Sequence, residues 1–174
     1  MNKIKSHVIY AVLLIVLSSA TYGETFGDFE YDVKNGEATL TAYKGKDLNI
    51  TIPTSIKDIP VTGIGTGCFK NNNTITKVII PQNINGIGDG AFNNCKSLQE
   101  IQISEGLVSL GHGALNGCIN LKKIRVPKSV TWIGSHVFTG CTSLVEVEIS
   151  LKGLNMGDKI FTDCSSLERV TILK

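Results

Sequence analysis

A period of 23 residues runs through the C-terminal part of this 174-residue chain. Four columns of residues keep this spacing. They are a glycine column (Gly65, Gly88, Gly111, Gly134, Gly157), a large apolar column (Phe69, Phe92, Leu115, Phe138, Phe161), a cysteine column (Cys95, Cys118, Cys141, Cys164) and an aliphatic column (Ile75, Leu98, Leu121, Leu144, Leu167). Columns that stay in register over five copies predict a solenoid, in which each repeat forms one coil and buries its apolar side against its neighbours.

Each repeat divides into a strand and a turn. Residues 77–80, 100–103 and 123–126 alternate polar and apolar side chains and are rich in β-branched residues, which predicts short parallel strands with one buried face. Pro81 and Pro127 end two of them, because proline has no N–H to donate. The glycine-centred segment at 87–92 predicts a tight turn or a short helical turn. The predicted fold is therefore an α/β solenoid, with short parallel strands and turns or short helical segments opposite.

The repeat pattern resembles a known family. From Ile87 to Ile103 the chain reads Ile-Gly-x-x-Ala-Phe-x-x-Cys-x-Ser-Leu-x-x-Ile-x-Ile, which is similar to the BspA-like (Treponema-type) leucine-rich repeats. The resemblance covers roughly residues 50–174. Small departures occur where Leu115 replaces Phe, Asn72 replaces Cys, and Ser104 and Ser150 replace the strand-ending Pro. The resemblance implies a leucine-rich-repeat protein that is secreted or surface-exposed, serves adhesion or host contact, and has no catalytic residues.

Residues 1–23 have the layout of a secretory signal peptide. Lys3 and Lys5 precede an apolar run at 8–17, and small residues follow up to Ala20, with Gly23 as another cleavage position. The alternative is an uncleaved N-terminal anchor. Both interpretations predict a secreted or cell-surface protein.

Residues 24–62 are expected to form an N-terminal β cap, and residues 63–174 the five repeats. Residues 29–33 and 38–43 alternate around Asn35-Gly36, the preferred pair for a two-residue hairpin turn. A third strand is expected at 48–52, ended by Pro53. No capping segment follows the last expected strand, at 169–173, and a bare strand invites pairing with another chain.

Charge and motifs argue against several function classes. Without residues 1–23, which hold two lysines and no acidic residue, the chain has 15 basic and 15 acidic residues. A nucleic-acid binder should show a basic excess. The sequence has no nucleophile elbow, phosphate loop or metalloprotease motif, and His112 and His136 do not have zinc-ligand spacing. We therefore expect no enzyme activity, cofactor, metal site or small-molecule substrate.

The cysteine column leaves two states open. Neighbouring coils place these residues about 5 Å apart, within the reach of a disulfide. Parallel side chains in a core stack rather than face each other, however, and a free cysteine there behaves as a small hydrophobe. We expect a reduced, buried column, with Cys68 in a separate interior column.

The candidate ligand contacts are outward-facing strand residues. In the charge column (Lys77, Glu100, Lys123, Glu146, Arg169) the sign alternates from coil to coil, and the next outward column holds Gln102, Arg125 and Glu148. The two columns could fix the coil register by ion pairing or offer a mixed-charge platform for a protein or glycan ligand, and these interpretations are compatible.

Trp132 is the remaining candidate contact. Its column otherwise holds the small or polar residues Gly86, Ser109 and Asn155, and tryptophan is enriched at binding interfaces. Alternatively it lies over Lys128 or a neighbouring coil.

The sequence thus predicts a binding module for protein–protein or host-surface adhesion. The alternative is a structural or assembly protein that self-associates through its C-terminal coil, and a third hypothesis is a truncated relative without a ligand.

Overall fold

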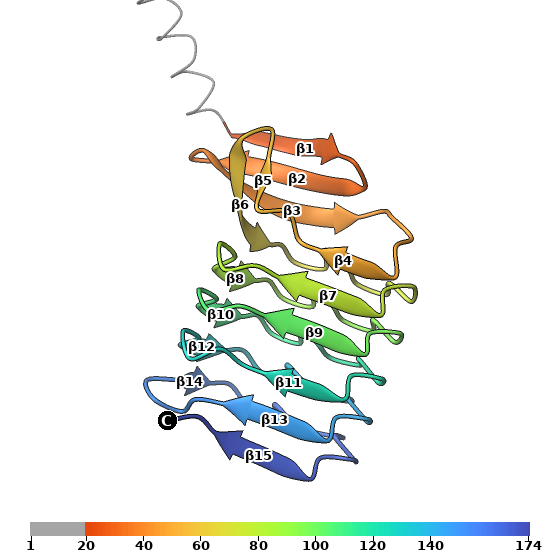
Figure 1. Cartoon of the computed structure of the whole chain (residues 1–174), viewed down its shortest axis with the longest axis vertical. Helices are drawn as coiled ribbons and strands as arrows, with labels where there is room; N and C mark the ends of the chain where they lie inside the picture. The colour runs from red at the N-terminus through yellow and green to blue at the C-terminus, as the bar shows by residue number, and fades with distance from the viewer. Residues whose placement is uncertain (1–19) are drawn as a thin grey trace, which may run out of the picture.

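The computed structural model describes residues 20–174, which form a β-solenoid with one coil stacked on the next (Figure 1). Most of the expected signal peptide, residues 1–19, lies outside the described residues. Residues 21–23, the last three of that expected segment, belong to the first strand, β1 (Thr21–Phe26).

An antiparallel cap opens the stack. It consists of β1, β2 (Phe29–Lys34) and β3 (Glu37–Tyr43). Lys34 pairs with Glu37 across Asn35 (φ 55°) and Gly36 (φ 78°), so the two-residue hairpin predicted from the sequence is present. β3 also pairs in parallel with a strand of the first coil, which makes the cap sheet continuous with the stack.

Two sets of parallel strands run along opposite sides of the solenoid (Figure 1). The long-strand face is formed by β4 (Asn49–Thr51), β7 (Lys77–Ile80), β9 (Glu100–Ile103), β11 (Lys123–Arg125), β13 (Glu146–Ile149) and β15 (Arg169–Ile172). The short-strand sheet continues from the cap through β6 (Ile59–Ile64), β8 (Gly86–Ile87), β10 (Ser109–Leu110), β12 (Trp132–Ile133) and β14 (Asn155–Met156), and β5 (Ser55–Ile56) pairs with β6 alone. Within residues 20–174 the long-strand face has six strands, one more than the five aligned repeats, because β4 precedes the first repeat and pairs with β7.

The α/β label and the helical segments expected opposite the strands are wrong: no helix occurs among residues 20–174. Two positions of each turn, four residues apart, have left-handed backbone. In one coil these are Gly90 and Asn94, both at φ 57°. Consecutive right-handed residues are needed to build a helix, and the residues between the two left-handed positions are too few. The described part of the chain accordingly contains no membrane-spanning helix.

The glycine column marks a close approach between the backbones of neighbouring coils. A Cβ on Gly111 would lie 2.5 Å from the carbonyl carbon of Gly88, and one on Gly134 would lie 2.6 Å from the amide nitrogen of His112. Any larger residue would force neighbouring coils apart, so the column recurs for a steric reason.

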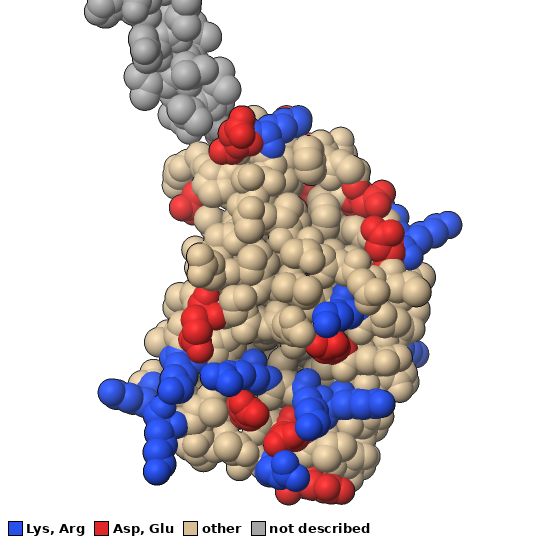
Figure 2. Space-filling model, in the orientation of Figure 1, with Lys and Arg blue, Asp and Glu red and all other residues tan. Residues whose placement is uncertain are grey.

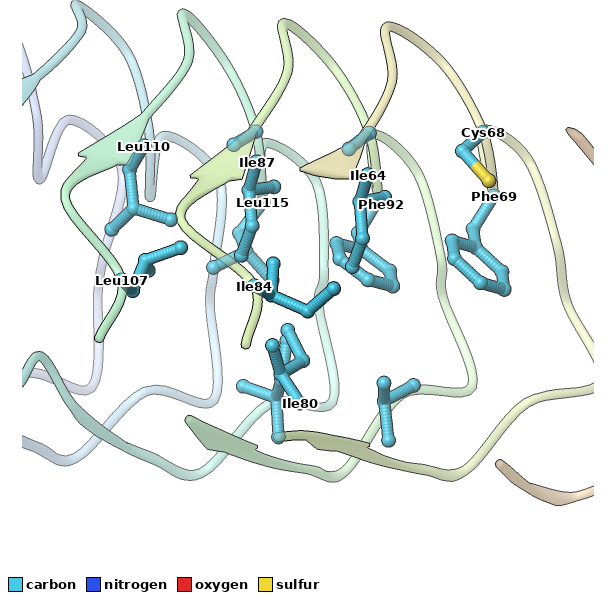
Figure 3. Close-up of a cluster of buried hydrophobic side chains, with 14 of the residues drawn as sticks. Ile64, Cys68, Phe69, Ile80, Ile84, Ile87, Phe92, Leu107, Leu110 and Leu115 are labelled. Carbon is cyan, nitrogen blue, oxygen red and sulfur yellow. The ribbon is translucent and has the colours of Figure 1, made fainter. Parts of the chain in front are cut away.

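The interior is filled from both sides (Figure 3). Ile87 and Leu110 point inward from the short strands, and Ile80 points inward from β7. The rings of Phe69 and Phe92 stack with centroids 4.8 Å apart and planes 7° from parallel. This continuous apolar layer is the core that holds the coils in register.

The structure shows all five cysteines as free thiols. Within the column each thiol donates to a carbonyl oxygen of the preceding coil, as Cys95 Sγ does to Phe69 O at 3.0 Å. Burial raises the pKa of Cys95 and of Cys141 to about 12.

Candidate functional site

The outward side of the long-strand face carries eight of the nine predicted contact residues. Along β7, Val78 and Ile80 are buried, while Lys77 and Ile79 point outward, and β4, β9, β11 and β13 repeat this alternation. Figure 2 shows Lys and Arg side chains gathered beside Asp and Glu over the C-terminal half of this face.

A first ion-paired group lies on β7 and β9. Lys77 Nζ is 3.1 Å from Glu100 Oε1, and Gln102 Nε2 donates to the same oxygen at 2.6 Å. The hydrogen bonds from Lys77 and then from Gln102 lower the pKa of the Glu100 carboxyl. Glu100 is therefore held as a carboxylate by residues of β7 and of its own strand, β9.

A second group lies on β11, β13 and β15. Glu146 accepts from Lys123 Nζ at 2.8 Å and from Arg169 Nη1 at 2.9 Å, and the Lys123 contact is the largest cause of its lowered pKa. In the next column Arg125 Nη1 is 3.6 Å from Glu148 Oε2. The predicted ion pairing is thus present within each group.

The two groups are separated by a break in the sheet. β4, β7 and β9 form one three-stranded sheet, and β11, β13 and β15 form another. Among residues 20–174 no ion pair joins Glu100 to Lys123, although the alternating column predicts one. We call this break the β9–β11 seam, meaning residues 99–103 facing residues 122–126.

Backbone hydrogen bonds mark the same break. Gln99 N donates to Thr76 O at 2.9 Å, and Val145 N donates to Lys122 O at 2.9 Å. By the 23-residue period the intervening bond would run from Lys122 N to Gln99 O, and the described residues do not form it.

The other end of the seam also lacks a bond. Ser104 N donates to Ile80 O at 3.0 Å, whereas its counterpart in the next coil is Pro127, which has no N–H. Ile103 is only partly buried, although Ile80 and Val126 in the same column are fully buried. On the opposite side β10 and β12 remain paired, so the coils are open on the long-strand face alone.

A hollow of about 470 Å³ lies over the seam. It is lined by Gln99, Glu100, Ile101, Gln102, Lys122, Lys123 and Arg125. Four of these residues were predicted as contacts. Gln99 and Lys122 were missed because they precede the strands and belong to no alternating column. Among the described residues Lys122 takes part in no salt bridge. Pro127 removes one backbone donor at the seam, but the equivalent Pro81 follows β7, which still pairs with β4, so proline does not by itself signal the break.

Trp132 does not join this site, because it lies on β12 in the short-strand sheet. It pairs with Ser109 on one side and Asn155 on the other, which matches its predicted column. Its half-buried ring packs against the His112 ring in a T-shaped arrangement, with centroids 5.3 Å apart and planes at 83°. The structure therefore places Trp132 on a face separate from the charged residues.

The chemistry available on the long-strand face is ion pairing and hydrogen bonding. Within residues 20–174 no cluster of three or more His, Cys, Asp or Glu side chains could hold a metal ion. The functional groups are lysine, arginine, glutamate and glutamine side chains together with the backbone groups of the seam.

Comparisons with solved structures give bacterial leucine-rich-repeat proteins. A leucine-rich cell surface protein from Faecalibacterium prausnitzii is 28% identical, with a TM-score of 0.77, over 86% of this chain and 39% of that one. A leucine-rich-repeat protein of T. pallidum is 31% identical, with a TM-score of 0.78, over 84% and 70%. One from Bacteroides capillosus is 27% identical, with a TM-score of 0.65, over 90% and 99%. The chain thus spans well under half of the F. prausnitzii protein. A search of curated proteins finds no match.

The family comparison covers the whole repeat region. The model for the BspA type leucine-rich repeat region matches residues 62–174 in six copies. Together with the 23-residue columns and the T. pallidum relative, this match shows that the chain belongs to the BspA-type leucine-rich-repeat family.

Proposed function

We propose that this protein is secreted or surface-exposed and binds a macromolecular ligand, in adhesion or host contact, through its long-strand face. The observation that carries the proposal is the fixed pattern of outward charges on this face. Lys77, Glu100, Lys123, Glu146 and Arg169 occupy equivalent positions on successive strands. The F. prausnitzii relative is described as a cell surface protein, which supports the proposed location.

The ion pairs serve recognition better than stability. An exposed pair contributes only about 0–1 kcal/mol to folding. The same pairs hold long side chains in place before a ligand arrives, which reduces the entropy lost on binding. A mixed pattern of charges also selects a complementary partner more than it raises affinity.

The test is a binding screen with a charge-reversed face. The purified chain is assayed against matrix proteins, glycans and host cells, beside the double variant Lys77→Glu/Arg169→Glu. The matched control is Lys152→Glu/Lys159→Glu, which makes the same charge change at exposed lysines outside the long strands.

We expect the face variant to weaken binding at least about tenfold, or ~1.4 kcal/mol, with the control unchanged. A folded wild-type chain that binds nothing in the panel contradicts the proposal. So does a control that loses as much affinity as the face variant.

A second candidate, self-association, is favoured by the exposed apolar side chains of β15. Val170 and Ile172 are 48% and 49% exposed, whereas their counterparts Val147 and Ile149 on β13 are 0% and 2% exposed. A second copy that packs against β15 would bury them and pair the strand edge.

Light scattering at increasing protein concentration tests this assembly. The mass should rise toward a dimer in the wild type and stay monomeric in Ile172→Lys. A wild-type chain that remains monomeric throughout rules the assembly out.

A further inference from the structure

We infer that the hollow over the β9–β11 seam binds a carboxylate side chain, and that the ligand is an acidic polypeptide segment. This inference rests on the proposed function, because it names a partner for the same face. It goes further in assigning one subsite and the chemistry that this subsite recognises.

The charges around the hollow leave one cation available. Its lining includes three cations and one carboxylate. Glu100 is bound by Lys77, and Lys123 and Arg125 contact glutamates of β13. Lys122 is exposed and forms no salt bridge with any described residue. An incoming carboxylate would therefore meet an amino group that has no competing partner, beside two further cations.

The backbone at the seam favours a peptide. Lys122 N–H and Gln99 C=O are not bonded to each other, although the corresponding groups of other coils are. A peptide presents both an acceptor C=O and a donor N–H, so it can bond to both groups at once. Backbone groups that are left unpaired when a ligand covers them cost free energy, so a ligand able to pair them is preferred.

The surrounding charges disfavour a polyanion. Adjacent strands lie about 4.8 Å apart, so a regularly charged chain laid across the face would meet glutamates as well as cations. The lining of the hollow contains no aromatic ring on which a sugar could stack. A polypeptide with a few acidic residues fits this alternating pattern better than a sulfated or uronic glycan.

The test uses the full chain, labelled with ¹⁵N, and a blocked peptide of about eight residues that carries two glutamates. We expect amide shift changes confined to residues 99–103 and 122–126. In Lys122→Glu the affinity should fall at least about tenfold. The matched control is Lys70→Glu, an exposed turn lysine outside the long strands, and it should bind as the wild type does. The same peptide with glutamines should not bind.

Three outcomes would overturn the inference. Shift changes could map elsewhere, Lys70→Glu could weaken binding as much as Lys122→Glu, or dextran sulfate could bind the hollow more tightly than the peptide. The amide spectrum of each variant reports whether it is folded.

The two proposals fail separately. If Lys77→Glu/Arg169→Glu abolishes ligand binding and Lys122→Glu does not, the face binds the ligand but the seam subsite is wrong. If the acidic peptide binds the hollow while the screened ligands bind Lys77→Glu/Arg169→Glu as tightly as the wild type, the proposed function is wrong.

Discussion

Replacing Gly111 with alanine tests whether the glycine column exists because the coils approach closely. The new Cβ would lie 2.5 Å from backbone atoms of the preceding coil, so the backbone must move about 0.9 Å to reach an ordinary contact. Three hydrogen bonds cross that contact: Gly111 N to Ile87 O (2.7 Å), His112 N to Asp89 Oδ1 (2.7 Å) and Gly90 N to His112 O (2.8 Å). At about 1 kcal/mol each, their loss lowers the free energy of unfolding by about 3 kcal/mol.

Gly113→Ala is the matched control, two residues away. Gly113 has a left-handed backbone (φ 57°), but the nearest atom to its added Cβ, on Asn116, is 3.6 Å away. Only the backbone conformation is strained there, so the expected loss is about 1–2 kcal/mol.

Urea unfolding followed by circular dichroism measures both variants. Gly111 has no left-handed strain, so without the steric contact alanine would be neutral or would stabilise by about 0.4–1 kcal/mol. If Gly111→Ala proves no more destabilising than Gly113→Ala, close approach does not explain the column.

Four further predictions concern the core and the charged face. Because burial raises the pKa of Cys95 and Cys141 to about 12, both thiols should resist a thiol reagent at pH 9 until the chain unfolds. Between about pH 9 and 12 these thiols ionise only in the unfolded state. The free energy of unfolding should therefore fall as the pH rises, by up to about 1.4 kcal/mol per pH unit for each thiol. Urea unfolding across that range measures this loss. Lys123→Gln should raise the lowered pKa of Glu146 toward its ordinary value, which carboxyl-carbon NMR measures. An unchanged pKa would show that Lys123 is not the main cause of the lowering. Phe92→Ala should cost about 3–5 kcal/mol of unfolding free energy, because the ring is fully buried and stacked, and a loss below 1 kcal/mol would contradict that packing.

The repeat made the side-chain columns predictable. Residues one period apart lie side by side in the structure, as Ser109 and Trp132 do on β10 and β12. Asn35-Gly36 predicted its hairpin because both residues tolerate a positive φ. In each case a local preference and the fold agree, so the sequence alone was enough.

The backbone of the turns was harder to predict. The left-handed column that prevents a helix contains Gly90 and Gly113, but also His136 (φ 61°) and Lys159 (φ 56°). Lys does not signal a positive φ in a sequence, and His does so only weakly, since the left-handed region is uncommon for non-glycine residues. The packing of the stacked coils imposes the left-handed conformation at these positions. Because the column contains several residue types, the sequence does not reveal that conformation.

The seam was beyond prediction for a related reason. Pro127 removes one donor, but Pro81 does the same two coils earlier, directly after β7, and β7 still pairs with β4. Proline alone therefore does not open the sheet. The missing bond from Lys122 N to Gln99 O involves backbone groups that every residue has, so no column of side chains can reveal it.

The ion pairs and the backbone hydrogen bonds of the long-strand face are nevertheless interrupted at the same step of the stack, between β9 and β11. Glu100 lies between two lysines in the charge column, and among the described residues it forms a salt bridge only with Lys77, on its own side of the seam. Glu146 also lies between two cations, yet it bonds to both, because its strand pairs on both sides. A carboxylate in the charge column thus bonds to the cations of both neighbouring coils where its strand pairs on both sides, and to one where it does not. The long-strand face is therefore not a uniform repeat of one binding unit. A ligand that covers it meets one position, the β9–β11 seam, at which backbone groups of neighbouring coils are not bonded to each other.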